Sequence, residues 1–95
     1  MEVSVRLFTT LREIIGSWQI KIRLRDDASL KELIETLVET YGPRVRDYLC
    51  REDGIVRENI NFFINGVKID KSHIESVKLK KGDTVAIIPP ISGGV

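Results

Sequence analysis

The sequence predicts an α+β fold, in which a mixed sheet of about four to five strands is covered on one face by one main α-helix. Three observations support this prediction. Segments near both ends of the chain alternate apolar and polar residues with the period of a strand. Between them, one segment places its apolar residues along a single helical face. A one-sided helix and a one-sided sheet cannot bury their apolar surfaces alone, so the two elements must pack together.

The length and composition limit the classes of function. The chain has 95 residues and a formal net charge of +1, from 15 Lys and Arg against 14 Asp and Glu. This length corresponds to one domain, and the balanced charge gives no electrostatic footprint for nucleic acid. No apolar run approaches the length of a membrane span, and the N-terminus lacks the features of a signal peptide. We therefore expect a cytoplasmic protein that binds neither nucleic acid nor membrane.

The N-terminal quarter is predicted to contain two strands joined by a short helix. Residues 2–7 alternate polar and apolar side chains, as a half-buried strand does. Residues 9–15 carry apolar side chains at helical spacing, with Thr10 as the candidate N-cap. Residues 18–25 alternate again from Trp18 onward, and their polar side chains are almost all basic. A basic polar face is typical of a water-facing or edge strand.

The main helix is predicted to follow Ser29. Ser29 and Glu32 form a capping-box pair. The apolar stripe of this helix consists of Leu30, Leu33, Ile34, Leu37, Val38 and Tyr41. Gly42 and Pro43 then stop the helix.

The second half is predicted to be mixed over residues 44–60, where Val45, Tyr48 and Leu49 can form a helical turn docked on the core, and then to form a hairpin and a last strand. Asn65-Gly66 is a strong two-residue hairpin signal between short apolar runs, and residues 84–88 form the final strand. A helix laid across a mixed sheet in this order is the β-grasp, or ubiquitin-like, arrangement. We place this domain at residues 1–88 and treat residues 89–95 as a flexible C-terminal tail.

The phase of the strands predicts an apolar patch on the face of the sheet that the helix leaves open. Phe8, Phe63, Ala86 and Ile88 are out of phase with the core-facing positions. Soluble monomers rarely expose such a patch without a purpose, so we expect it to bind a partner. The alternative is that loops or residues 44–60 cover it.

The C-terminal residues are suited to presenting a chain end. Pro89 and Pro90 end the strand ladder and favour a stiff, extended exit. Gly93 and Gly94 have no side chains, so the backbone can enter a narrow tunnel with its carboxylate leading. The alternative is an ordinary frayed terminus.

A family resemblance lies in three segments, VSVRLFTTLREIIG (3–16), INGVKID (64–70) and KKGDTVAIIPPISGG (80–94). These segments resemble the MoaD family, the small subunit of molybdopterin synthase, within the ThiS/MoaD ubiquitin-like sulfur carriers. The Gly-Asp before the last strand and the Pro-Pro-x-Ser-Gly-Gly ending are the most specific matches. Residues 44–60 match least.

The resemblance implies that a separate MoeB-like enzyme, of the ubiquitin-activating type, adenylates the Gly94 carboxylate with ATP. The adenylate would then accept sulfur and become a thiocarboxylate. That sulfur would pass to a pterin in a MoaE-like large subunit, and the two kinds of subunit would form a heterotetramer. The product dithiolene would hold molybdenum or tungsten. Pro89, Pro90, Ser92 and Gly93 would be the tail residues that partners recognise. The chain itself would be a carrier without catalytic residues, and would bind no cofactor.

Val95 departs from the family pattern, because these carriers normally end at the second glycine. A β-branched residue should not enter a tunnel shaped for glycine. We therefore expect a peptidase to remove Val95; otherwise the tail is not activated.

The rest of the sequence shows no catalytic constellation and no metal site. His73 is expected on the surface, and Cys50 is expected to be a packed thiol that forms no intrachain disulfide. Three alternatives stay open beside the molybdopterin carrier. They are a sulfur carrier for thiamin or tRNA thiolation, a ubiquitin-like modifier joined through Gly94 to lysines, and an interaction module with an inert tail.

Overall fold

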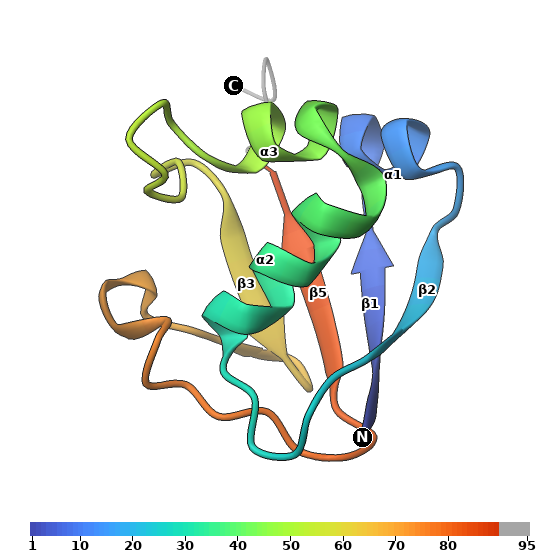
Figure 1. The fold of residues 1–95 in the computed structure, drawn as a ribbon, viewed down its shortest axis with the longest axis vertical. Helices are drawn as coiled ribbons and strands as arrows, with labels where there is room; N and C mark the ends of the chain where they lie inside the picture. Colours follow the sequence, from blue (N-terminus) through green and yellow to red (C-terminus); the bar gives the residue numbers. More distant parts are fainter. Residues whose placement is uncertain (90–95) are drawn as a thin grey trace.

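The structure is a computed structural model that describes residues 1–89. Its strands are β1 (Glu2–Leu7), β2 (Gln19–Arg23), β3 (Asn61–Ile64), β4 (Val67–Lys68) and β5 (Thr84–Ile88). Its helices are α1 (Thr9–Ile15), α2 (Leu30–Tyr41), α3 (Pro43–Leu49) and the 3-10 helix η1 (Lys71–His73). The main helix α2 crosses the sheet, and α1 and α3 lie at the end of the sheet where β1 and β5 finish (Figure 1).

The sheet is mixed and has five strands in the order β2-β1-β5-β3-β4. The two central strands, β1 and β5, are parallel, and Leu7 is paired with Ile87. The other neighbours are antiparallel. This topology confirms the predicted β-grasp fold.

The core lies between α2 and the inner face of the sheet. Val5, Leu37 and Phe62 have no exposed surface, and they come from β1, α2 and β3. Ser29 caps α2 as predicted, because its Oγ accepts a hydrogen bond from the Glu32 N–H at 3.2 Å. Glu32 also forms an ion pair with Arg25, which lies just beyond the end of β2 at Arg23. That pair ties α2 to the chain that leads into it.

The hairpin between β3 and β4 has the expected turn. Asn65 and Gly66 both have positive φ, 50° and 86°, which is the type I′ turn that suits the twist of a hairpin. The Asn65 side chain also links this turn to β5. Its Nδ2 donates to Asp83 Oδ1 at 2.9 Å, and its Oδ1 accepts from the Thr84 N–H at 2.9 Å.

One local prediction is wrong. Thr10 does not cap α1; Phe8 takes the N-cap position and makes no side-chain cap bond. The helix begins at Thr9, as predicted, directly after the extended Phe8, and Thr9 has φ 48°. Strand β2 is shorter than the predicted residues 18–25, because Trp18 precedes it and is 56% exposed at the rim of the sheet.

The helical turn predicted from Val45, Tyr48 and Leu49 is confirmed in the segment 44–60. The first part of this segment is α3, which buries Val45 and Leu49 and contacts α1 and α2. An isolated bridge between Cys50 and Val56 then closes the following loop. Helix α3 therefore belongs to the helical layer, on the side of the sheet where the core lies.

Candidate docking face and chain end

The strand register places the predicted patch residues on one face. Ala86 is paired with Phe63 on β3 and with Arg6 on β1. These three side chains therefore form a row across the open face, opposite in phase to the buried Val85 and Ile87. The four residues predicted from strand phase do lie on this side of the sheet.

The open-face patch, defined as Phe8, Phe63, Ala86 and Ile88, is partly accessible. Phe8 is 40% exposed, and the other three side chains are half-buried. Phe8 continues the extended backbone of β1, with φ −130° and ψ 152°, so its side chain lies on the side opposite to Leu7. Because Leu7 is paired with Ile87, Phe8 and Ile88 meet at the same end of the sheet. The partner-binding role of the patch stays a prediction.

The last described residue, Pro89, lies at the margin of this patch. Pro89 directly follows Ile88 and is buried, so the described chain finishes where the patch finishes. Pro90, Ser92, Gly93, Gly94 and Val95 lie outside the described residues. Their proposed roles in recognition, activation and processing stay predictions, as does the division into domain and tail.

Basic residues border the patch, and sequence reasoning did not bring them together. Lys21 and Arg23 of β2 are exposed on the open face. The adjacent strand β1 adds Arg6, whose Nε donates to Gln19 Oε1 at 3.1 Å. The basic polar face of β2 was visible in the sequence as an edge-strand signal. Its position beside Arg6 and the patch follows only from the strand order.

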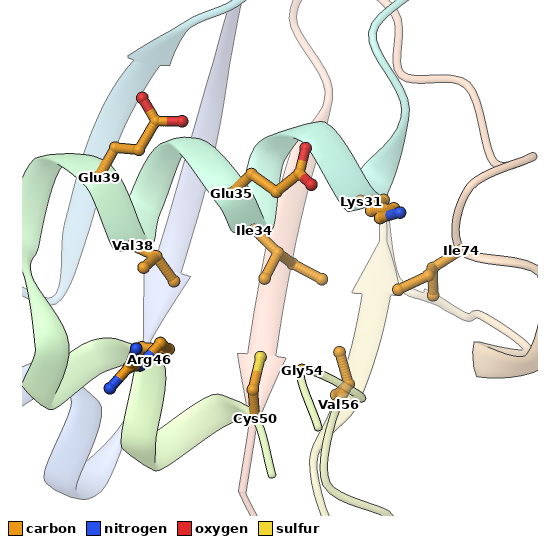
Figure 2. Close-up of a pocket in the computed structure, with 10 residues that line it drawn as sticks. All are labelled: Lys31, Ile34, Glu35, Val38, Glu39, Arg46, Cys50, Gly54, Val56 and Ile74. Carbon is orange, nitrogen blue, oxygen red and sulfur yellow. The ribbon is translucent and has the colours of Figure 1, made fainter. Parts of the chain in front are cut away.

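A groove lies in the helical layer, lined by residues of α2, α3 and the loop that follows α3. This groove of about 470 Å³ has an apolar floor that includes Ile34, Val38 and Val56. The Cys50 side chain points between α2 and the 54–56 loop, and charged side chains of α2 and α3 form the rim (Figure 2). Among the described residues, none of the open-face patch lines it.

Cys50 and His73 match the roles expected for them. Cys50 is a buried free thiol, and burial raises its pKa, against the smaller lowering effects of Arg57 and Arg46. A thiol in this state is a packing group with little thiolate character. His73 is exposed at the end of η1.

Neither a membrane span nor a metal centre is found in residues 1–89. The helices in this range are too short or too polar to cross a bilayer. Within the same range, no three His, Cys, Asp or Glu side chains gather closely enough to hold a metal ion.

The fold and the open face define a β-grasp protein of the ubiquitin-like class. The model of the ThiS family matches residues 5–94. The chain therefore belongs to the ThiS family and is a member of the ubiquitin-like sulfur carriers. This confirms the family that the three sequence segments indicated.

Relatives of two kinds are similar over nearly the whole chain. Small archaeal modifier protein 3 of Haloferax volcanii is 32% identical over 94 residues, which cover 99% of this chain and 100% of that protein. The molybdopterin synthase sulfur carrier subunit of Drosophila yakuba is 31% identical over 94 residues, which cover 99% and 92%. The crystal structure of SAMP1 from Haloferax volcanii superposes with a TM-score of 0.86 at 26% identity, covering 99% and 100%.

Proposed function

We propose that this chain is the sulfur carrier of molybdopterin-type cofactor synthesis, loaded at Gly94 after removal of Val95. The observation that carries the proposal is that the family match extends to residue 94 and so includes the Gly-Gly end. The similarity to a molybdopterin synthase sulfur carrier subunit supports the choice of pathway. The position of Pro89 beside the open-face patch supports it too, because a partner docked there would receive the chain end.

The chemistry divides between the chain and its partners. A free carboxylate is a poor acyl donor, so the Gly94 carboxylate first attacks the α-phosphorus of ATP and releases pyrophosphate. Hydrosulfide then attacks the carbonyl carbon of the acyl adenylate, AMP leaves, and loss of the S–H proton gives a thiocarboxylate. The tethered sulfur reaches its acceptor with a high effective concentration. The chain acts as a group carrier, and the catalytic groups belong to a MoeB-like adenylating enzyme and a MoaE-like subunit, in a heterotetramer.

A modifier function is the second candidate. The observation that favours it is the 32% identity to small archaeal modifier protein 3 over the full length of both chains. In that case the activated Gly94 carbonyl is attacked by a lysine amine, AMP leaves, and an isopeptide bond forms. Adenylation is common to both candidates, and the nucleophile that follows distinguishes them.

The intact mass of the protein recovered from its own cells tests the proposal. Loss of one valine, together with exchange of one oxygen for sulfur, is the expected result. High-mass conjugates that contain this chain would favour the modifier. A mass that retains Val95 and gains no sulfur would contradict both candidates and favour an interaction module.

The requirement for processing can be tested separately with purified chains. A chain that ends at Gly94 should support ATP–pyrophosphate exchange by the adenylating enzyme, and the matched chain that ends at Val95 should not. Equal exchange by both chains would show that removal of Val95 is unnecessary.

A further inference from the structure

Strand β2 forms one edge of the sheet, two strands away from β5 (Figure 1). Its hydrogen bonds show which way each residue points. Met1 and Leu24 exchange both of their backbone bonds, and the Leu7 N–H donates to the carbonyl oxygen of Trp18. Bonded pairs alternate along an antiparallel ladder. The even-numbered residues of β2 therefore direct their N–H and C=O groups toward β1, and the odd-numbered residues direct theirs outward.

The outward groups of Lys21 and Arg23 are available for pairing. The residue opposite Lys21 on β1 is Ser4, and its N–H donates away from β2, to the carbonyl oxygen of Asp83 at 2.9 Å. Within residues 1–89, the backbone N–H and C=O groups of Lys21 and Arg23 have no hydrogen-bond partner. Such a row of donors and acceptors is a template for a further strand.

The chain closes one end of this row itself. Ser17 Oγ donates to the carbonyl oxygen of Gln19 at 2.8 Å and accepts from the Gln19 N–H at 3.4 Å. Both outward groups of Gln19 are therefore occupied, and the free stretch of β2 is limited to residues 21–23. We call residues 21–23 the open edge.

The side chains along β2 present two different surfaces to a strand that pairs with the open edge. On one side, Lys21 and Arg23 are exposed and form no ion pair within residues 1–89, even though Glu2 lies opposite Arg23. On the other side lie Trp18, which is 56% exposed, and the half-buried Ile20. Successive side chains of a strand point to opposite faces, so a complementary strand alternates acidic and apolar residues.

We propose that the open edge binds an extended segment of a partner protein, in which acidic and apolar residues alternate and which adds a strand to the sheet beside β2. The acidic side chains of the segment pair with Lys21 and Arg23, and its apolar side chains contact Trp18 and Ile20. Hydrogen bonds between the two backbones supply affinity, and the alternating side chains supply specificity.

The chemistry of the open edge selects this occupant. The free groups of Lys21 and Arg23 match the donors and acceptors of a peptide backbone, which favours a protein over a nucleic acid. A second copy of this chain is disfavoured, because pairing of two β2 strands brings like charges together. The inference goes beyond the proposed function and does not depend on it, since none of its contacts involves residues 89–95.

A synthetic peptide tests the proposal with the full chain. The probe is acetyl-Gly-Val-Asp-Val-Glu-Val-Asp-Gly-amide, added at low ionic strength. Trp18 is the only tryptophan and lies directly before β2, so its fluorescence reports binding. We expect saturable binding, with the amide signals of Lys21 and Arg23 among the most shifted in heteronuclear NMR spectra and with slower hydrogen exchange at both amides.

Two N-methylated forms of the probe distinguish strand pairing from attraction between charges. In an antiparallel pair the acidic residues direct their N–H groups at β2, and in a parallel pair the valines do so. One form is methylated at the acidic residues and the other at the valines, and both keep every side chain. One form should bind at least tenfold more weakly than the probe, and the other should bind as the probe does. Equal binding by all three peptides would overturn the proposal.

Charge variants of the protein test the contribution of the side chains. The double variant Lys21→Gln, Arg23→Gln should bind the probe about fivefold or more weakly, since two exposed ion pairs are lost. Lys31 and Arg44 are exposed cations outside β2, so their double Gln variant has the same net charge and should bind as the unmodified chain does. Thermal unfolding, followed by circular dichroism, checks that both variants are folded. Equal weakening in the two variants would mean that net charge attracts the peptide, and would overturn the proposal.

The oligomeric state tests the choice of occupant. We expect the chain without the probe to sediment as a monomer. A dimer that the probe dissociates would make a second copy the occupant of the open edge, and would overturn the choice of an acidic partner segment. None of these results bears on the sulfur-carrier proposal, which is tested at the chain end.

Discussion

Cys50 is the residue at which burial most directly limits reactivity. Its thiol is 8% exposed, and burial raises its pKa from the ordinary value of 9.0. At a given pH, the folded protein therefore holds less thiolate than the unfolded chain. Because the folded pKa is raised, the stability that this thiol contributes is present below pH 9.0 and is lost as pH rises through the folded pKa.

We expect iodoacetamide to alkylate Cys50 slowly in the native protein. The rate should be on the order of tenfold or more below that of the chain in denaturant, because reaction requires local opening. The midpoint of the native rate–pH profile should lie above that of the unfolded chain. Cys50 is the only cysteine, so mass spectrometry reports this site alone. Equal native and denatured rates would show that the thiol is accessible.

Gly66 is a residue whose backbone conformation, not its surroundings, limits substitution. Its φ is 86°, and a Cβ added there would meet no heavy atom within 4 Å. The Gly66→Ala change should therefore cost about 1–2 kcal/mol, the penalty for a left-handed L-residue. Urea unfolding measures this loss, and Gly66→Asn should cost less than Gly66→Ala, because asparagine tolerates the left-handed conformation better. An unchanged midpoint for Gly66→Ala would mean that the hairpin does not require this turn type.

At the scale of elements, the N-cap of α2 is the main local stabilising device. Ser29 is buried and its Oγ accepts from the Glu32 N–H. We expect Ser29→Ala to lower stability by about 1 kcal/mol, or about 4–8 °C in Tm for a domain of this size. Ser29→Thr should retain most of the cap. If both variants unfold together with the unmodified protein in calorimetry, the cap contributes little.

Elements with a strong local signal could be predicted from the sequence, and those fixed by distant contacts could not. The bounds of α1 and β5 agree with the prediction because each follows a periodicity within its own segment. The wrong N-cap at Thr10 has a long-range cause, since β1 must stay extended through Phe8 to keep its register with β5. The loop after α3 is closed by a bridge between Cys50 and Val56, and no local pattern encodes that pairing.

At the scale of the whole molecule, the candidate site was only half predictable. Strand phase alone is enough to assign Phe63, Ala86 and Ile88 to the open face. The strand order is needed to place Arg6 between Gln19 and Ala86, so the grouping of Arg6 with the basic residues of β2 emerges only in three dimensions. The Gly-Gly end is the reverse case, because its signal is wholly in the sequence and it lies outside the described residues.

Phe62 and Phe63 allow the two faces of the sheet to be separated by experiment. These neighbours lie on opposite faces, and Phe62 is fully buried while Phe63 is half-buried. Phe62→Ala opens a cavity in the core and should cost about 3–5 kcal/mol of stability. Phe63→Ala removes apolar area that is partly in water already, so its cost should be about 1–2 kcal/mol.

In adenylation the two substitutions should rank the other way. Once the difference in stability is allowed for, Phe63→Ala should impair adenylation more than Phe62→Ala does. With chains ending at Gly94, and at a temperature where both variants are folded, Phe63→Ala should lower kcat/KM about tenfold or more. Loss of a central apolar anchor commonly has this effect on an interface. Phe62→Ala should retain most of its kcat/KM under the same conditions, because its side chain never reaches the partner. If Phe63→Ala is adenylated as well as the unmodified chain, the open face is not the docking surface, and the chain end must be delivered by contacts elsewhere.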